Sequence, residues 1–210
     1  MRALLAAVFA WVLGGATASA DQAGAFDYYV LALSWNAAWC AVEGEARGAE
    51  QCDPRHDRGF TLHGLWPQHE DGWPEYCATR AQDPSRAETG GEADLYGSGG
   101  LAWHQWKKHG RCSGLSSKDY FALAREAYRR VERPEVLRQL DRPVELPARV
   151  VEEAFLESNP DLSGPGVAIR CREGLVYEVR VCLTRGLQPR ACSASAARDC
   201  RGTATLLPMR

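Results

Sequence analysis

Hydrophobic residues lie along the chain in short runs, and the first two runs predict buried strands. Residues 26–35 are almost all apolar or aromatic, which is typical of a buried strand. Residues 60–63 form a second, shorter run. We expect this second strand to stop at Gly64, because Pro67 lacks the backbone donor that a central strand needs.

Two further apolar runs near the C-terminal end predict a β-hairpin. Residues 167–170 and 175–183 flank Glu173 and Gly174, which suit a turn. A helix is expected before the hairpin, over residues 147–157. This order of elements predicts an α+β fold with a central antiparallel sheet. No shift in composition divides the chain, so a single domain is expected.

The middle of the chain shows the periodicity of helices. Residues 101–109 predict one helix, which we expect to end at Gly110 in a left-handed C-cap. Residues 118–131 predict a second helix with its apolar residues on one stripe. Either Ser116 or Ser117 can cap the N-terminus of this second helix.

Two polar stretches predict loops. Residues 40–58 are rich in Gly, Glu and Arg, and we expect Cys40 and Cys52 to staple this loop. Residues 79–100 hold five glycines and many charges. This composition predicts a long mobile loop, or a loop that contains a frayed helix.

Residues 1–20 have the parts of a secretory signal peptide. Arg2 supplies a positive charge, residues 3–13 are apolar, and an A-x-A cleavage site ends at Ala20. The alternative is a membrane anchor, but the apolar run is shorter than the ~20 residues that a membrane span needs. We therefore expect cleavage after Ala20, and a secreted or periplasmic catalytic domain over residues 21–210.

All eight cysteines follow this segment, and their even number in an exported protein favours four disulfides over a metal site. No C-x-x-C pair occurs, which weakens a zinc interpretation further. Eight cysteines allow about 105 pairings, so the pattern alone leaves the connectivity open. The cysteines are Cys40, Cys52, Cys77, Cys112, Cys171, Cys182, Cys192 and Cys200.

The overall charge argues against a protein that coats nucleic acid. The formal net charge is −2, and it becomes −3 without residues 1–20, because that segment holds one Arg and no acid. Positive charge is instead local, since Lys107, Lys108 and Arg111 lie close together in the sequence. This pattern suits a site that holds one phosphate.

All five histidines fall within residues 56–109, and two of them share one face of a predicted helix. Lys108 lies about 40° from His104 around the helix axis. Gln105 and His109 follow at about 100° and 140°. Such crowding favours a site that binds a ligand. The alternatives are a solvated face with incidental histidines, or zinc, which the i, i+5 spacing of the two histidines fits poorly.

A further histidine lies in residues 60–68, which read FTLHGLWPQ. His63 ends a predicted strand and precedes Gly64, a position from which a side chain can project into a cleft. Trp66, held by Pro67, offers a flat face beside it. A hydrogen-bonded core histidine and a packing tryptophan are the alternatives for these residues taken singly.

Together, the segments FTLHGLWPQ and LAWHQWKKHGRC resemble the two catalytic segments of the ribonuclease T2 family. The resemblance extends to residues 26–35, to the S-x-K-D-Y-F sequence at 116–121 and to the cysteine-rich C-terminal end. It implies a disulfide-stapled α+β fold and a metal-independent endoribonuclease that needs no cofactor. Such enzymes cleave single-stranded RNA by attack of the ribose 2′-hydroxyl, which leaves a 2′,3′-cyclic phosphate and later a 3′-phosphate.

The resemblance also implies a role for each site residue. His109 is the general base and His63 the general acid, with these roles reversed for hydrolysis of the cyclic product. His104 contacts the phosphate, and Lys108 neutralises the charge that develops on it. Trp66 stacks on a base, which suits weak base specificity. The helix dipole favours a charged His109 and Lys108 opposes it, so the charge of His109 stays open.

Two residues depart from the family pattern. Many members carry Glu where this chain has Gln105, and we expect this change to alter the rate or the pH profile without abolishing activity. Some members carry an acidic, base-contacting residue in place of Gln68, so the base preference stays open. A catalytically weakened RNA-binding protein and a defence or toxin protein are the alternatives on the same fold. We expect a monomer in each case.

The resemblance further suggests how the cysteines pair. A bridge between Cys77 and Cys112 would anchor the predicted catalytic helix just beyond its end, and each bridge can stabilise the fold by about 2–4 kcal/mol. The expected pairs are Cys40–Cys52, Cys77–Cys112, Cys171–Cys200 and Cys182–Cys192.

Overall fold

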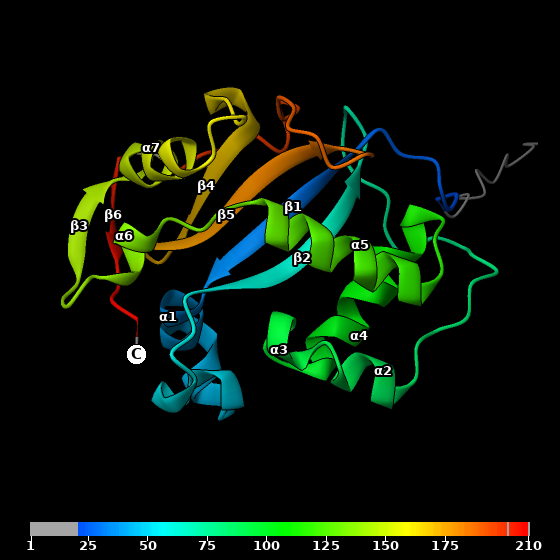
Figure 1. Cartoon of the computed structure of the whole chain (residues 1–210), viewed down its shortest axis with the longest axis horizontal. Helices are drawn as coiled ribbons and strands as arrows, with labels where there is room; N and C mark the ends of the chain where they lie inside the picture. The colour runs from blue at the N-terminus through cyan, green and yellow to red at the C-terminus, as the bar shows by residue number, and fades with distance from the viewer. Residues whose placement is uncertain (1–20, 201, 210) are drawn as a thin grey trace, which may run out of the picture.

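One six-stranded sheet organises the computed structural model, which describes residues 21–200 and 202–209. The expected signal peptide, residues 1–20, lies outside the described residues. The strands are β1 (Tyr28–Trp35), β2 (Phe60–Gln68), β3 (Val144–Pro147), β4 (Val167–Arg172), β5 (Leu175–Thr184) and β6 (Thr203–Leu206). Their order in the sheet is β2-β1-β5-β6-β3, and β4 pairs with β5 (Figure 1).

The expected α+β class is confirmed, but the sheet is mixed rather than purely antiparallel. β5 and β6 run parallel and pair at Leu175 and Thr205, whereas the other described pairs are antiparallel. The expected hairpin is confirmed as β4 and β5. Its turn residues Glu173 and Gly174 have φ of 52° and 77°, which is the left-handed backbone that a two-residue hairpin turn requires.

β2 is longer than the sequence predicted. It continues through Gly64 and Pro67 instead of stopping at Gly64. Pro67 lies opposite Tyr29 of β1, and β1 is the neighbour that the sheet order gives β2. An edge strand tolerates a residue without an N–H, because one side of its backbone needs no partner strand.

Helices fill the connections between the strands. The described helices are α1 (Asn36–Trp39), α2 (Arg86–Gly90), α3 (Ala93–Tyr96), α4 (Gly99–Lys108), α5 (Ser117–Arg130), α6 (Glu135–Arg138) and α7 (Ala148–Ser158). α5 and α7 confirm two predicted helices, and the hydroxyl of Ser116 caps α5 by accepting from the N–H of Asp119. None of the described helices is long and apolar enough to cross a membrane.

The two segments that were expected as loops contain regular turns. Residues 79–100 hold α2, α3 and the start of α4. Ser85 and Glu88 form a capping box that satisfies the first N–H groups of α2. The stapled segment consists of short helical turns at Cys40–Gly44, Glu45–Arg47, Glu50–Cys52 and Pro54–His56.

The end of α4 also differs from the prediction. The last helical residue is Lys108, and Gly110 opens a 3-10 turn without a left-handed backbone. The left-handed residue is Gly114, with φ of 78°. A Cβ at Gly110 would lie 2.6 Å from Cε3 of Trp106 and 2.9 Å from Cδ1 of Tyr120. Close packing, rather than backbone conformation, therefore requires glycine at position 110.

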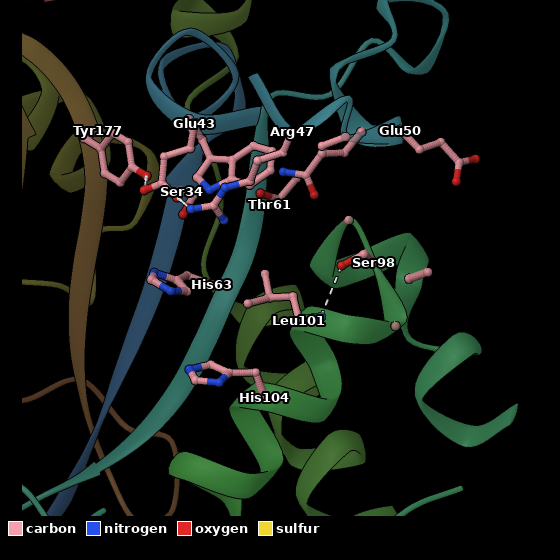
Figure 2. A pocket seen from close by; sticks show the side chains of 16 residues that line it. Ser34, Glu43, Arg47, Glu50, Thr61, His63, Ser98, Leu101, His104 and Tyr177 are labelled. Atoms are coloured by element: carbon pink, nitrogen blue, oxygen red, sulfur yellow. Dashed lines mark hydrogen bonds and ion pairs between the residues drawn. The ribbon is translucent and has the colours of Figure 1, made fainter. Parts of the chain in front are cut away.

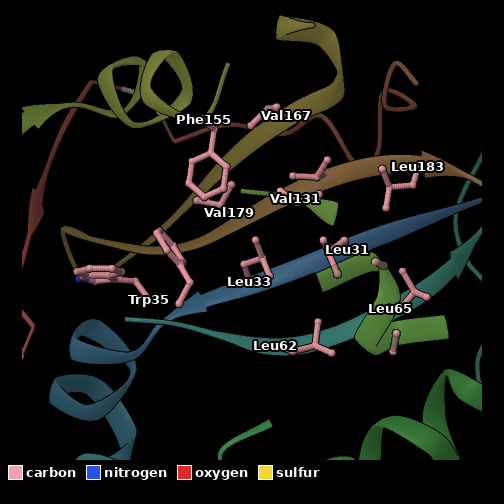
Figure 3. Close-up of a cluster of buried hydrophobic side chains, with 14 of the residues drawn as sticks. Leu31, Leu33, Trp35, Leu62, Leu65, Val131, Phe155, Val167, Val179 and Leu183 are labelled. Atoms are coloured by element: carbon pink, nitrogen blue, oxygen red, sulfur yellow. The ribbon is translucent and has the colours of Figure 1, made fainter. Parts of the chain in front are cut away.

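The main core lies between the sheet and the helices that pack on it (Figure 3). Leu33 of β1, Leu62 of β2 and Val179 of β5 are fully buried on the sheet side. Phe155 of α7 and Trp106 of α4 belong to the same cluster. This packing joins α4 to the sheet and so fixes the helix that carries three of the expected site residues.

All four expected disulfide pairings are confirmed. Cys77–Cys112 joins the loop after β2 to the turn that follows α4. The other three bridges are Cys40–Cys52, Cys171–Cys200 and Cys182–Cys192.

Candidate active site

A β-bulge in β2 places His63 on the same face as Trp66. The pairing register with β1 shifts at this point, and His63 is the extra residue that has no partner on β1. Side chains alternate between the faces of a strand, so residues three positions apart normally point to opposite faces. The bulge shifts the alternation, and the two ring centroids lie 5.0 Å apart.

α4 docks against β2 through Gln105. Nε1 of Trp66 donates a hydrogen bond to Oε1 of Gln105 at 2.7 Å, and both side chains are buried. Gly64 leaves the space for this contact, because a Cβ there would lie 2.2 Å from the Trp66 nitrogen and 2.3 Å from the Gln105 oxygen. Trp106 anchors the helix in the core. The orientation of α4 is therefore set from two sides.

Trp66 forms a wall that both candidate catalytic histidines share. Its ring centroid lies 5.2 Å from that of His109, with the planes stacked at 29°. His63 meets the same indole edge-on, at an interplanar angle of 78°. The Arg180 guanidinium lies 5.0 Å from the indole centroid. Only 8% of Trp66 is exposed, so protein groups already cover most of its surface.

His63 is paired with a buried carboxylate that sequence reasoning missed. Nδ1 of His63 lies 2.5 Å from Oε2 of Glu178 on β5, and Nε of Arg180 donates to Oε1 of Glu178 at 2.7 Å. Burial alone would raise the pKa of Glu178, but the hydrogen bond and charge of His63, together with Arg180, lower it to about 2. An ionised carboxylate only accepts hydrogen bonds, so Nδ1 of His63 carries the proton.

Glu178 and Arg180 could have been found from their place in the sequence. Both interrupt the apolar run of β5 at alternate positions, which indicates that one face of this strand is polar. Glu178 is only 3% exposed, and a buried carboxylate needs a charged partner. The sequence did not show which residue pairs with Glu178, because His63 lies 115 positions away along the chain.

His109 lies in contrasting surroundings, directly after the last residue of α4. It is 6% exposed, and its Nδ1 is buried without a hydrogen-bond partner among the described residues. Burial, followed by the charge of Lys108, lowers the pKa of His109 to about 3. His109 is therefore uncharged at neutral pH, which answers the question that the sequence left open.

Lys108 lies beside an exposed aromatic loop. Its Nζ is 3.4 Å from Oε2 of Glu75, and the same oxygen accepts a hydrogen bond from Nε1 of Trp73. The N–H of Tyr76 donates to the carbonyl oxygen of Lys108 at 2.8 Å, which ties this loop to the end of α4. Trp73 and Tyr76 are both 54% exposed. The sequence motifs did not single out this loop.

Lys107 and Arg111 lie away from the histidines, which corrects the expected cluster of positive charge. Nζ of Lys107 is 2.8 Å from Oδ2 of Asp83, and Arg111 contacts Oδ1 of the same residue at 2.6 Å. Asp83 therefore engages both cations on the side of α4 where Trp106 also donates to its carboxylate. Lys108 and Arg180 lie nearer the two histidines, with Lys108 beside His109 and Arg180 against Trp66 and Glu178.

A cleft of about 720 Å³ opens beside these groups (Figure 2). His63 from β2 and His104 from α4 line it together. Burial and then the charge of Lys108 lower the pKa of His104. Glu43 and Tyr177 line another part of the cleft, where the tyrosine hydroxyl donates to the Glu43 carboxylate at 3.1 Å.

Gln68 and two further histidines are placed elsewhere. Gln68 is buried, and its amide donates to the carbonyl oxygen of Pro67 at 2.9 Å. His56 and His69 lie outside the catalytic segments, each within 4 Å of a surface carboxylate. The structure therefore brings His63, His109 and Trp66 together, and it leaves Gln68 outside this group.

The described residues contain no group of three or more His, Cys, Asp or Glu side chains that could hold a metal ion. The four disulfides engage all eight cysteines, so no thiolate is available as a ligand.

Known proteins share this combination of motifs and fold. The model of the ribonuclease T2 family matches residues 26–192. A ribonuclease of Aeromonas hydrophila is 36% identical over 197 residues, which cover 90% of this chain and 87% of that protein. The structure of an RNase-related protein from Calystegia sepium has a TM-score of 0.69 at 23% identity, over 87% of this chain and 97% of that one. RNase NT in complex with 5′-AMP has a TM-score of 0.61 at 23% identity, over 88% and 99% of the two chains. The chain therefore belongs to the ribonuclease T2 family.

Proposed function

We propose that this protein is an endoribonuclease that cleaves single-stranded RNA without a metal ion or cofactor. The ribose 2′-hydroxyl attacks the adjacent phosphorus and the 5′-oxygen of the next nucleotide leaves, so that a 2′,3′-cyclic phosphate forms. Water then opens the cyclic phosphate to a 3′-phosphate. Family membership supports this reaction. The observation that carries it is the pair His63 and His109, which share one indole but have opposite surroundings.

His109 serves as the general base of the first step. A base must be uncharged before it accepts the 2′-hydroxyl proton, and a pKa of about 3 keeps His109 uncharged at neutral and mildly acidic pH. Such a low pKa also makes a weak base. The negative charge of a bound phosphate raises the pKa of a nearby imidazole, so substrate binding itself strengthens this base.

His63 serves as the general acid. Its Nδ1 is engaged by Glu178, which leaves Nε2 to protonate the departing 5′-oxygen. A carboxylate hydrogen-bonded to Nδ1 fixes the orientation of the imidazole and the nitrogen that carries the proton. Glu178 is thus a positioning residue. In the second step the two histidines exchange roles.

Lys108 and His104 hold the phosphate and offset the negative charge that grows on it in the transition state. Gln105 acts differently, because its oxygen accepts the Trp66 hydrogen bond inside the protein. An amide oxygen fills this acceptor position as a carboxylate would. This contact supports a positioning role for Gln105 and retained activity.

In this proposal, exposed aromatic residues bind the bases of the RNA. Trp73 and Tyr76 are 54% exposed, whereas Trp66, which was expected to stack on a base, is 8% exposed. We therefore assign Trp66 to positioning the histidines and assign stacking to the loop beside Lys108. Aromatic stacking accepts every base, which suits low base specificity.

Export and the monomeric state belong to the same proposal. The signal-peptide pattern of residues 1–20 supports cleavage after Ala20 and a secreted or periplasmic protein. Four disulfides suit an oxidising compartment. N-terminal sequencing of the exported protein and its mass in solution test these two points.

Product analysis with a panel of dinucleoside phosphates tests the proposed reaction. In the presence of EDTA we expect the cyclic phosphate first, the 3′-phosphate later, and no cleavage of the 2′-deoxy analogues. The relative rates across the panel report the base preference. Loss of activity in EDTA with recovery on addition of Zn²⁺ would contradict the metal-free mechanism.

A catalytically weakened RNA-binding protein is the alternative, and Gln105 is the observation that favours it. The retained His63, His109 and Lys108 favour the enzyme. Wild type is compared with His63→Ala and His109→Ala for cleavage and for RNA binding. Binding without cleavage by the wild type would support the alternative, and equal cleavage by all three would indicate a contaminating nuclease.

A further inference from the structure

A second cavity, of about 620 Å³, adjoins the catalytic cleft at the N-terminal turn of α4. The proposed reaction does not use it. Trp103 lines this cavity and is 39% exposed, whereas Trp106, one turn along the same helix, is fully buried. A large apolar side chain left exposed beside an active site is a candidate for contact with a ligand.

The ridge between the two cavities is formed by backbone. Gly99 lines both of them. A Cβ at Gly99 would lie 3.0 Å from the carbonyl oxygen of Thr89, so this turn packs closely on α2. At Gly100 a Cβ would meet only Oγ of Ser98, at 3.9 Å. Because both residues are glycines, no side chain at these positions separates the cleft beside His104 from Trp103.

The second cavity combines an aromatic face with positive charge. Nζ of Lys107 lies 5.5 Å from the ring centroid of Trp103. Arg86 lines the cavity and is exposed, and no contact between its guanidinium and another described residue is seen. Two carboxylates on neighbouring segments are already engaged: Asp83 with Lys107, and Glu88 with the backbone N–H that begins α2.

We propose that this cavity is a distal nucleotide subsite, which rests on the proposed ribonuclease function. Its occupant is a base of the same RNA strand, outside the two nucleotides that flank the scissile phosphate. This base stacks on Trp103, and Arg86 contacts a phosphate of the strand. The shared Gly99 ridge and the cationic rim favour a continuous RNA strand over an apolar peptide. The subsite strengthens RNA binding and takes no part in the chemical step. It therefore lowers KM, and only for substrates long enough to reach it.

Two substrates with the same scissile step test this proposal. One is a dinucleoside phosphate, and the other is a DNA hexanucleotide with one ribonucleotide at the scissile position. We expect Trp103→Ala to lower kcat/KM for the hexanucleotide about tenfold, through KM, and to leave the dinucleotide unchanged. Trp103→Phe should keep most of the affinity, and Arg86→Gln should act in the same direction as Trp103→Ala but less. Val150→Ala, an exposed apolar residue on α7, is the matched control and should change neither substrate.

Equal losses on both substrates, or no loss on either, would overturn the subsite. A binding measurement keeps this test separate from catalysis, because an all-deoxy hexanucleotide binds without being cleaved. Fluorescence anisotropy should show weaker binding of this hexanucleotide to Trp103→Ala than to wild type. If the wild type cleaves neither substrate, the proposed function fails. Unchanged affinity of Trp103→Ala in the binding measurement would then still overturn the subsite.

Discussion

His63 and His109 contact the same indole, yet the protein surrounds them in opposite ways. His63 lies on a bulged strand, its side chain is about one-third exposed, and a buried carboxylate accepts a hydrogen bond from its Nδ1. His109 lies at the end of a helix, almost fully buried, with no partner for Nδ1 among the described residues. The charge that acts most strongly on it is the cation of Lys108.

This difference shows how one kind of side chain can supply both halves of acid–base chemistry. Burial and a neighbouring cation keep His109 uncharged, and Glu178 holds a proton on His63. Pairs of titratable groups with opposed surroundings are typical of sites in which one group donates a proton and the other accepts it. The predictions below test whether the two histidines differ in this way.

Removal of either histidine should have the largest effect. We expect His63→Ala and His109→Ala each to lower kcat for RNA by about 10²–10⁴-fold, because each removes one proton-transfer group. An aryl phosphodiester of a ribonucleoside separates the two roles, since its leaving group needs no proton. His63→Ala should recover much of its rate on this substrate, and His109→Ala should not. Recovery by His109→Ala instead would reverse the assignment of acid and base.

Glu178→Gln should have the next largest effect. An amide accepts the Nδ1 hydrogen bond without a negative charge, whereas a hydrogen bond to a charged group contributes about 1.5–3 kcal/mol. We therefore expect kcat for RNA to fall about 10- to 100-fold, with a smaller loss on the aryl substrate. Glu153→Gln, which removes an exposed carboxylate on α7, is the control. Equal losses on both substrates would show that Glu178 does not act through the acid.

The burial of His109 should also appear in the pH dependence of stability. Its pKa is about 3 in the folded protein and about 6.5 in the unfolded chain, so the unfolded state binds more protons between these values. The stabilising effect is complete above about pH 6.5 and is lost as the pH falls towards 3. His109→Gln removes this group. Its free energy of unfolding should fall less steeply between pH 6 and 4, by about 1.4 kcal/mol per pH unit. Parallel slopes for the variant and the wild type would show that His109 titrates normally.

Gln105→Glu should have the smallest effect. A carboxylate at this buried position can still accept the Trp66 hydrogen bond, so the fold of the site is retained. Its negative charge favours a protonated His109, and we expect the acidic limb of kcat/KM to move up by about one pH unit. Gln188→Glu, on the surface away from the cleft, is the control. An unchanged rate and pH profile would show that the residue at position 105 does not influence His109.

Helical periodicity correctly predicted some of the residues that share a face of α4. It grouped Gln105 with His109, and both side chains do contact Trp66 in the structure. Proximity in the sequence, and not helical periodicity, grouped Lys107 with the site, whereas in the structure this side chain pairs with Asp83. Local spacing therefore describes one helix well, but the neighbours of each face come from the tertiary structure.

The strand residues were harder to predict because their positions depend on long-range pairing. The bulge at His63 is a property of the register between β1 and β2, and the sequence pattern around His63 does not predict it. Glu178 meets His63 only because β1 pairs with both β2 and β5. The same arrangement buries Trp66, which the sequence alone presented as a free aromatic face.

The protonation of the two rings is the central claim, and NMR of the histidine side chains at pH 5 tests it most directly. Ring ¹⁵N chemical shifts of the free enzyme distinguish charged from uncharged imidazoles and identify the nitrogen that carries the proton. We expect an uncharged His109 and a proton on Nδ1 of His63. A charged His109, or an Nδ1 of His63 without a proton, would contradict the account.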